Sequence, residues 1–193
     1  MNKKHIITIA GKLGSGKSST AKKVAEILGY EHLSSGDFMR DIAIERGISL
    51  MELNKMAEGD NSIDKELDDR NIEMGKQSNI VIDSRLGFHF IPDSFKVYLD
   101  LYPEVAAERI LKDKENNPNR YKEDNRAFDS KEDIMTSIMN RQESERNRYD
   151  KLYGIKDMSH SNNFDLIIDT SKYSLEEVVQ KIAEEYKKWL EMS

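Results

Sequence analysis

Gly11-Lys12-Leu13-Gly14-Ser15-Gly16-Lys17-Ser18 is the stretch that decides the fold of this chain. It has the spacing G-x-x-x-x-G-K-S, which is typical of a loop that binds phosphate groups. An apolar run precedes it at 5–10, and a helical pattern follows it at 18–28. Glycines let the backbone approach a phosphate closely, and the N-terminus of the following helix favours negative charge. We therefore predict a phosphate-binding loop between a strand and a helix.

The polar side chains beside this loop predict phosphate and metal chemistry. Lys17 supplies a positive charge to the terminal phosphates, and Ser18 offers a hydroxyl to Mg²⁺. Asp83 ends a second apolar run, 79–83, where a carboxylate would face the loop and hold Mg²⁺ through water. The alternative for Asp83 is an ordinary turn cap at the end of a strand.

Composition bounds the class of protein. The chain has 193 residues with a net charge of −6, 34% charged residues and no cysteine. We expect one domain, 1–193, without disulfides or thiolate metal sites. No apolar run approaches the roughly 20 residues of a membrane span, and no secretory signal is evident, so we expect a cytoplasmic protein without a membrane partner. The acidic balance argues against nucleic-acid binding through a broad basic face. A monomer is expected.

Strand-like and helical segments alternate along the whole chain. The expected strands are 5–10, 30–34, 79–83, 95–100 and 164–169. This alternation predicts an α/β protein with a parallel sheet covered by helices on both faces. In such sheets ligands bind beyond the carboxyl ends of the strands. Residues 112–133 are very polar and are expected to form a mobile loop that runs into a helix at 131–152.

A second anion site is suggested by polar residues that follow the other strands. Asp37 can accept from a sugar or base, and Arg40 can contact a phosphate with two N–H groups. Arg85 follows the Asp83 strand and suits a second anion. The alternatives are a capped helix start with a solvent-facing Arg40, and a salt bridge between Arg85 and a neighbouring carboxylate.

Arginines and lysines also surround the polar segment. Arg141, Glu145 and Arg148 fall on one face of the expected helix by their spacing. A polar lid that carries arginines could deliver them to a transferring phosphoryl group on closure. The alternative is a solvated helix with intrahelical ion pairs. The cations considered are Arg109, Lys112, Arg120, Arg126, Arg141, Arg146 and Arg148.

These residues together resemble the nucleoside monophosphate kinase family of P-loop kinases, and most closely its archaeal-type cytidylate kinase branch. The motifs that carry the resemblance are Gly11 to Ser18, Ser35-Gly36-Asp37 with Arg40, Ile63-Asp64 with Leu67-Asp68, Asp83-Ser84-Arg85-Leu86, Glu108-Arg109-Ile110, Arg141 to Tyr149, Tyr153-Gly154-Ile155 and Phe164 to Ser171. The resemblance implies a three-layer α/β/α P-loop kinase fold with a five-stranded parallel sheet. It also implies an acceptor-binding helical region at about 35–78 and a lid loop at about 112–133.

The resemblance also implies roles for individual residues. ATP and Mg²⁺ would be the cofactors, and small-molecule nucleotides the partners. Catalysis would rest on Lys17, Arg85, Arg141 and Arg148. The acceptor would be held by Asp37, Arg40 and Arg85, and the metal by Ser18 and, through water, Asp83. ATP would contact Gly11, Lys12, Leu13, Gly14, Ser15, Gly16, Lys17, Ser18, Ser19, Arg109 and Thr170.

Two positions depart from the family pattern. Ser84 stands where the family usually has glycine in an Asp-Gly-Arg or Glu-Gly-Arg turn, which would tighten the acceptor pocket. Asp113, flanked by Lys112 and Lys114, stands where a second arginine usually follows Arg109. A lysine there would act as a point charge without the two-pronged geometry of arginine.

The expected activity is ATP-dependent phosphorylation of a nucleoside monophosphate, CMP or dCMP, to the diphosphate. One alternative is a P-loop kinase of another acceptor, such as AMP, UMP, shikimate, dephospho-coenzyme A or a nucleoside. Another is a noncatalytic P-loop regulator that binds nucleotide, because a P-loop indicates phosphate binding more firmly than turnover. A GTPase is disfavoured, since the chain lacks the guanine-reading N-K-x-D.

Overall fold

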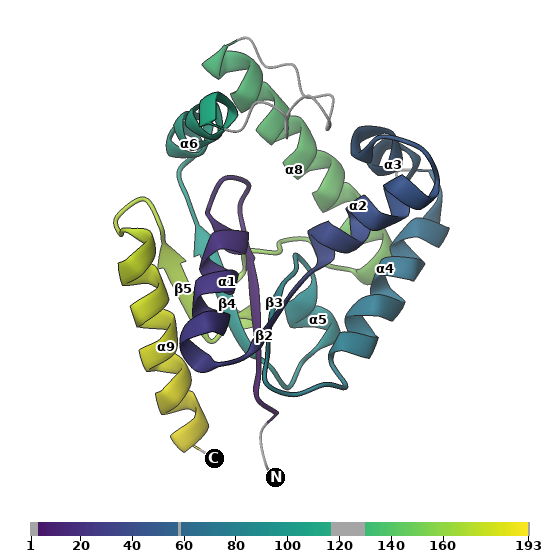
Figure 1. Cartoon of the computed structure of the whole chain (residues 1–193). Coiled ribbons are helices and arrows are strands. Elements are labelled where there is room, and N and C mark those ends of the chain that lie inside the picture. The colour runs from purple at the N-terminus through teal and green to yellow at the C-terminus, as the bar shows by residue number, and fades with distance from the viewer. Residues whose placement is uncertain (1–3, 58, 117–129, 193) are drawn as a thin grey trace.

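The computed structural model describes residues 4–57, 59–116 and 130–192, and places five parallel strands in the order β2-β3-β1-β4-β5. The strands are β1 (Ile6–Gly11), β2 (Glu31–Ser34), β3 (Ile80–Asp83), β4 (Phe95–Asp100) and β5 (Leu166–Asp169). β1 lies at the centre, between β3 and β4 (Figure 1). The predicted five-stranded parallel sheet is confirmed.

Strand register brings the candidate residues to one edge of the sheet. Ile9 on β1 pairs with Asp83 on β3, Asp83 also pairs with Ser34 on β2, and Gly11 pairs with Leu99 on β4. The carboxyl ends of all these strands therefore meet beneath α8, on the side away from the N- and C-termini (Figure 1). A ligand held by the loop after β1 lies within reach of the residues after β2 and β3.

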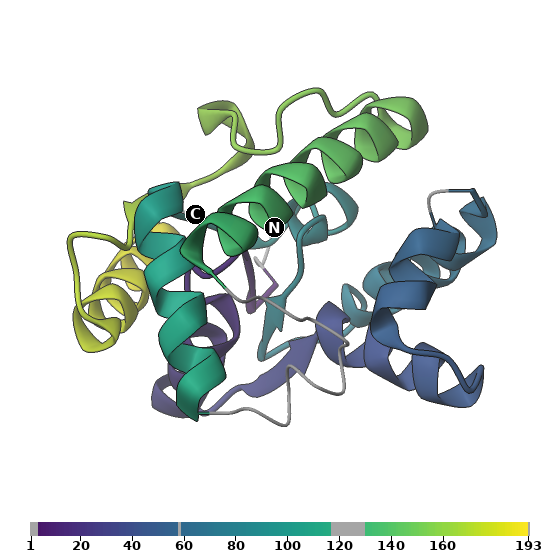
Figure 2. The same cartoon turned by 90° about the horizontal axis from the view of Figure 1, so that it is seen from above.

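Helices cover both faces of the sheet and extend beyond its carboxyl edge. They are α1 (Lys17–Leu28), α2 (Ser35–Glu45), α3 (Leu50–Ala57), α4 (Asn61–Met74), α5 (Gly87–Phe90), α6 (Pro103–Asn116), α8 (Lys131–Tyr153) and α9 (Leu175–Glu191), with a 3₁₀ turn at Ser161–Asn163. Seen from above, α2, α3 and α4 form one group to the side of the sheet, and α6 lies on the opposite side (Figure 2). The three-layer α/β/α arrangement agrees with the prediction.

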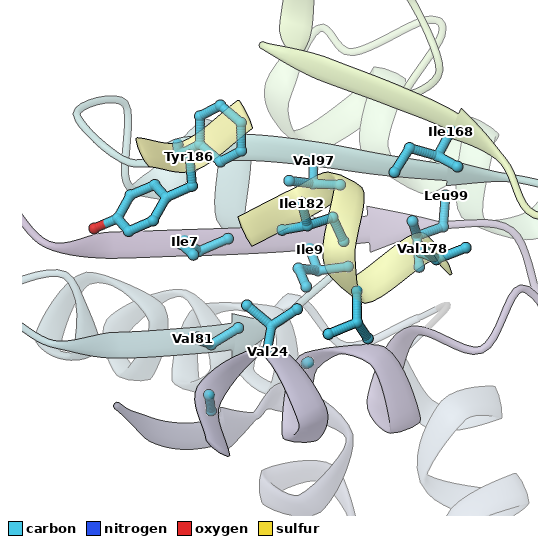
Figure 3. Close-up of a cluster of buried hydrophobic side chains, with 14 residues drawn as sticks. Ile7, Ile9, Val24, Val81, Val97, Leu99, Ile168, Val178, Ile182 and Tyr186 are labelled. Atoms are coloured by element: carbon cyan, nitrogen blue, oxygen red, sulfur yellow. The ribbon is translucent and has the colours of Figure 1, made fainter. Parts of the chain in front are cut away.

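The largest core cluster lies between the sheet and the helices α1 and α9. Alternate strand residues such as Ile7, Ile9 and Val97 point toward Val24 of α1 and Ile182 of α9 (Figure 3). The other alternation, for example Ile6 and Ile82, packs on the opposite face. Both faces of the central strands are thus apolar, which explains why their sequences are nearly continuous hydrophobic runs. This buried framework fixes the positions of the strand ends.

Side-chain caps mark where two long helices begin. The Ser130 hydroxyl accepts from the Asp133 N–H at the start of α8. Ser174 and Glu177 form a reciprocal capping box at the start of α9, as the sequence predicts.

The structure changes the expected elements in two places. α6 continues to Asn116, so residues 112–116 are helical where a loop is expected. The short helix α5 is not anticipated from the sequence. The remaining lid residues 117–129, with Arg120 and Arg126, lie outside the described residues. Within the described ranges, no helix combines the length and apolarity required to cross a bilayer.

Candidate active site

The loop between β1 and α1 has the backbone shape of a phosphate cradle. Gly14 has a φ of 77°, and a Cβ atom there would lie 3.2 Å from the Ala106 carbonyl oxygen. At Gly11 the same atom would lie only 2.4 Å from the Leu99 carbonyl oxygen. These two positions require glycine because the loop passes so close to β4 and α6. The sequence motif therefore corresponds to a real constraint of packing.

Lys17 is folded back over this loop. Its ammonium donates to the carbonyl oxygens of Gly11 at 3.0 Å and Lys12 at 2.9 Å. Burial, which is the main cause, and the positive charges of Arg85 and Arg141 together lower the pKa of the Lys17 ammonium to about 7, although Asp83 opposes them. The ammonium therefore lies within electrostatic range of two of the predicted arginines.

Ser18 and Asp83 lie side by side, as the sequence predicts. The Ser18 hydroxyl donates to a carboxylate oxygen of Asp83, which is buried at the end of β3. A hydroxyl and a carboxylate next to a phosphate cradle form the all-oxygen environment that Mg²⁺ prefers, with phosphate oxygens and water completing the shell. Among the described residues, no group of three or more acidic, histidine or cysteine side chains forms a protein-only metal site. The residues present fit a metal that is shared with a nucleotide.

Two of the predicted catalytic arginines share one buried carboxylate. Arg85, after β3, contacts one oxygen of Glu145, and the Arg141 Nε lies 2.8 Å from the other. Glu145 is 6% exposed. The pair Arg141–Glu145 follows the expected helical spacing, whereas the link to Arg85 joins α8 to the sheet edge. Both alternatives from the sequence, an ion pair at Arg85 and an intrahelical pair at Arg141, are therefore observed.

Arg148 lies apart from this group, against α4. Its Nε is 3.6 Å from a carboxylate oxygen of Asp64, and its guanidinium carbon is 5.3 Å from the centre of the Tyr149 ring. The Arg148 Nε and the second Asp64 oxygen are buried without a hydrogen-bond partner among the described residues. Burial raises the pKa of the Asp64 carboxyl, and Arg148 opposes this. The structure thus places Arg148 with the helices of the expected acceptor region, and its expected catalytic role remains a prediction.

A neighbouring contact also ties α8 to α4. The Tyr153 hydroxyl donates to Asp68 at 2.7 Å. Burial, which is the main cause, and the hydrogen bond to Asp68 both raise the pKa of the Tyr153 hydroxyl. The second half of α8 is therefore anchored to the acceptor-side helices by Arg148 and Tyr153.

The expected adenine-side residues meet at the ends of β4 and β5. Arg109 donates to the Thr170 carbonyl oxygen at 2.6 Å and to its hydroxyl at 3.2 Å. The Thr170 hydroxyl donates in turn to the Asp100 carbonyl oxygen at 3.0 Å. Lys12 forms an ion pair with Asp100 at 2.7 Å. These contacts bring the predicted residues Arg109, Thr170 and Lys12 to one side of the loop.

Asp37 and Arg40 are brought to the same sheet edge but pair with each other at the surface. Both side chains are largely exposed, which matches the alternative of a helix start with a solvent-facing arginine. Their predicted contact with the acceptor remains a prediction.

A hydrogen-bonded hub that the sequence does not reveal lies beneath these residues. The Asn71 side-chain oxygen accepts from Ser84 at 2.9 Å and from Ser35 at 3.1 Å. The Asn71 amide donates to the Leu67 carbonyl oxygen at 2.8 Å. Ser84, the departure from the usual glycine, thus links β3 to α2 and α4. In the sequence, Ser84 in place of the usual glycine was the one sign of this hub, and its hydrogen-bond partner Asn71 on α4 could not be predicted.

A cleft of about 960 Å³ lies beside the phosphate loop. Its walls include the phosphate loop with Ser19, residues Asn54 and Lys55 of α3, Arg109 and Asp113 of α6, and Arg141 and Arg148 of α8. Figure 2 shows the loop between the α2–α4 group and α6, with α8 across it. The arrangement can hold one phosphate chain in the loop and a second anion opposite.

Comparisons with known proteins agree with this geometry. A family model described as an AAA domain matches residues 10–134. A shikimate kinase structure from Bacteroides thetaiotaomicron superposes with a TM-score of 0.62 over 94% of this chain and 98% of that one. Its 14% sequence identity supports a common fold only. The fold and the loop together define a P-loop kinase.

Relatives of this chain with curated names identify its family. A cytidylate kinase from Pyrococcus horikoshii is 39% identical over 91% of this chain and 84% of its own length. Other cytidylate kinases match at 34–38% identity. The chain belongs to the archaeal-type cytidylate kinases of the nucleoside monophosphate kinase family.

A relative of different name matches this chain over part of its own length. An S-adenosylmethionine-dependent nucleotide dehydratase from Lacinutrix mariniflava is 33% identical over 94% of this chain. The chain spans 36% of that protein.

Proposed function

We propose that this chain transfers the terminal phosphoryl group of ATP to CMP or dCMP and forms the diphosphate. The observation that carries the proposal is the convergence of Lys17, Arg85 and Arg141 around the loop, with Arg85 and Arg141 sharing Glu145. Lys17 and Arg141 line the cleft, and Arg85 shares a carboxylate with Arg141. Three cations so placed suit two anionic substrates that must approach each other. The family relationship supports the same activity.

In this reaction an oxygen of the acceptor phosphate attacks the γ-phosphorus of ATP. The new P–O bond forms as the bond from the γ-phosphorus to the β–γ bridging oxygen breaks, so ADP leaves. A general base is unnecessary because the attacking atom is already an ionised phosphate oxygen. Lys17 and the loop amides hold the donor phosphates, and Arg85 and Arg141 stabilise charge on the transferring group. Mg²⁺, held by Ser18 and through water by Asp83, would neutralise phosphate charge.

The acceptor is proposed to lie between α8 and the helices α2–α4, which would form the acceptor-binding region. Arg148 and Asp64 offer a buried donor and a buried acceptor side by side. Cytosine presents the matching pair on its pairing edge, an amino donor at N4 next to an acceptor at N3. Uracil reverses both groups, so the same residues would disfavour UMP.

We also propose roles for the other residues expected to contact the two substrates. Asp37 and Arg40 would approach the acceptor from the start of α2, and Arg109 with Thr170 would lie against the adenine of ATP. The segment after α6 would act as the lid. A cytoplasmic monomer is the state that we propose from composition, and light scattering at several concentrations would test it.

A coupled assay with Lys17→Ala tests the assignment of the donor site. The wild type is expected to form ADP and CDP in equal amounts, and the variant to lose turnover by at least about 100-fold. The melting temperature of the variant should stay close to the wild-type value, because the hydrogen bonds of the Lys17 ammonium within the described residues go to carbonyl oxygens of the loop. Full activity in Lys17→Ala would refute the role of the loop as the ATP site.

A further inference from the structure

Glu145 is a buried acid that contacts two of the proposed catalytic arginines. Its two carboxylate oxygens engage different elements: one contacts Arg141 in its own helix, and the other contacts Arg85 after β3. We infer that Glu145 is a positioning residue that fixes Arg85 and Arg141 as a pair, so that both guanidinium groups face the same transferring phosphoryl group. The inference rests on the proposed kinase function.

Charge explains why such a residue is needed. Arg85 and Arg141 each lie close enough to Lys17 to disfavour its ammonium. Three like charges this close together repel each other, and the repulsion is strong where water is excluded. Asp83 is the acid that opposes the Lys17 shift, whereas Glu145 lies directly between the two arginines. Glu145 therefore offsets the repulsion at the point where the arginines approach each other.

Burial separates this carboxylate from the ordinary surface acids of α8. The Glu145 side chain is 8% exposed, and the partner side chains are 21% exposed at Arg85 and 33% at Arg141. A surface pair in one helix contributes little, but removing one partner of a buried pair leaves an uncompensated charge. Glu143, two residues earlier, is exposed and provides a matched control in the same helix.

The carboxylate also connects two elements of the site, the segment after β3 and the helix α8. Arg85 follows β3 at the sheet edge, and Arg141 is on α8, where it lines the cleft. A shared carboxylate keeps the spacing of the two guanidinium groups constant. Displacing a catalytic group by about 1 Å costs roughly 100-fold in rate. The effect of losing Glu145 should therefore fall on kcat.

The test compares steady-state kinetics of Glu145→Gln, Glu145→Asp and Glu143→Gln. We expect Glu145→Gln to lower kcat roughly 10- to 100-fold with the KM for ATP within about 2-fold. Glu145→Asp keeps the charge and should recover part of the loss, and Glu143→Gln should behave as wild type. If Glu145→Gln unfolds in a thermal melt, Glu145→Asp carries the test, with kcat expected to fall several-fold.

A second comparison separates positioning from direct contact with the acceptor sugar. CMP and dCMP differ by the 2′-hydroxyl, so a sugar-binding carboxylate would lose more with CMP. The positioning role predicts that Glu145→Gln lowers kcat by the same factor with both. Unequal factors, or a kcat within about 3-fold of wild type in both Glu145 variants, would overturn the inference. Absence of turnover in the wild type would instead refute the proposed function.

Discussion

Lys17 shows how strongly its surroundings act on a single residue. Its ammonium is held by the carbonyl oxygens of Gly11 and Lys12, yet burial and two arginines lower its pKa to about 7. Phosphate groups bound in the loop would add negative charge and raise that pKa. Nucleotide binding above neutral pH is therefore coupled to proton uptake by Lys17.

The first prediction concerns pH. Between about pH 7 and 9 the affinity for ATP should fall as pH rises, because a growing fraction of Lys17 must take up a proton to bind. Calorimetric titrations near about pH 8.5, in buffers of different ionisation enthalpy, should show proton uptake in the wild type and none in Lys17→Met. Equal proton uptake in both proteins would contradict the assignment to Lys17.

The same pKa also affects stability. The unfolded chain, with an ordinary lysine pKa of 10.5, binds more protons than the folded one between about pH 7 and that value. The contribution of Lys17 to the free energy of unfolding therefore becomes more favourable as pH rises through this window.

The second prediction uses two glycines with similar backbone angles. Gly14→Ala and Gly29→Ala both place a side chain at positive φ, which costs about 1–2 kcal/mol. Only Gly14 would also press on Ala106, since nothing lies within 4 Å of a Cβ at Gly29. Gly14→Ala should weaken ATP binding about 10-fold or more, measured by calorimetry, whereas Gly29→Ala should only lower the melting temperature. If Gly14→Ala and Gly29→Ala bound ATP with equal affinity, the phosphate-binding loop would not require glycine at position 14.

At the scale of residues, the sequence predicted the loop and the Ser18–Asp83 pair well, because these depend on short-range spacing and on strand ends. Helical spacing allowed the Arg141–Glu145 pair, but the sequence could not predict that Arg85 would contact the same carboxylate or which acid Arg148 would pair with. Arg85 and Arg141 meet at Glu145, whereas Arg148 pairs with Asp64 more than 80 positions away in the chain. The long-range contacts of Arg85 and Arg148 depend on how α8 crosses the sheet, and the local sequence pattern does not predict that crossing.

At the scale of elements, the five strands and most helices follow from hydrophobic patterns and caps. Apolar runs marked the buried strands, and the Ser174 capping box marked α9. The short helix α5 has only one turn, which is too little to produce a helical period. The polarity of residues 112–116 suggested a loop, but α6 continues through them because a helix can be polar where it faces solvent and the cleft.

The third prediction tests the Asn71 hub that joins α2, α4 and the end of β3. Ser84→Ala removes one buried hydrogen bond of 2.9 Å. Ser94→Ala removes two, to Thr8 at 2.9 Å and to the Ile91 carbonyl oxygen at 2.8 Å, at residues that do not line the cleft. Ser84→Ala should cost about 1 kcal/mol of stability in denaturant unfolding, and Ser94→Ala about 1–2 kcal/mol. Only Ser84→Ala should raise the KM for CMP, by roughly 5-fold, with the KM for ATP unchanged. A similar KM change in Ser94→Ala would show that general loosening is responsible.

At the scale of the whole molecule, the buried sheet positions the proposed donor and acceptor sites close to each other. The proposed donor site comprises the loop, α1 and the Arg109–Thr170 contact, and the proposed acceptor site comprises Arg85 and the helices α2–α4. The register of β1 with β3 brings them together, because it aligns Ile9 with Asp83. A substitution in one of the two proposed sites should therefore change the KM of one substrate more than that of the other.

The fourth prediction follows from that division. Arg85→Ala should raise the KM for CMP roughly 10- to 100-fold, the cost of a lost charged hydrogen bond, with the KM for ATP within about 2-fold. Arg146→Ala, an exposed arginine on α8, is the control and should leave both constants unchanged. Initial-rate measurements with each substrate varied in turn provide the comparison. Equal increases in both constants would remove Arg85 from the acceptor site.

The central claim is that this cleft is where the γ-phosphoryl group of ATP is transferred to CMP or dCMP. The most direct measurement is a coupled assay with ATP and CMP, dCMP, UMP, AMP, GMP, dTMP or shikimate as the acceptor. We predict that CMP and dCMP give the highest kcat/KM, at least about 10-fold above UMP, because Arg148 and Asp64 match cytosine and oppose uracil. Preference for another acceptor, or phosphorylation of none of the monophosphates, would contradict the account.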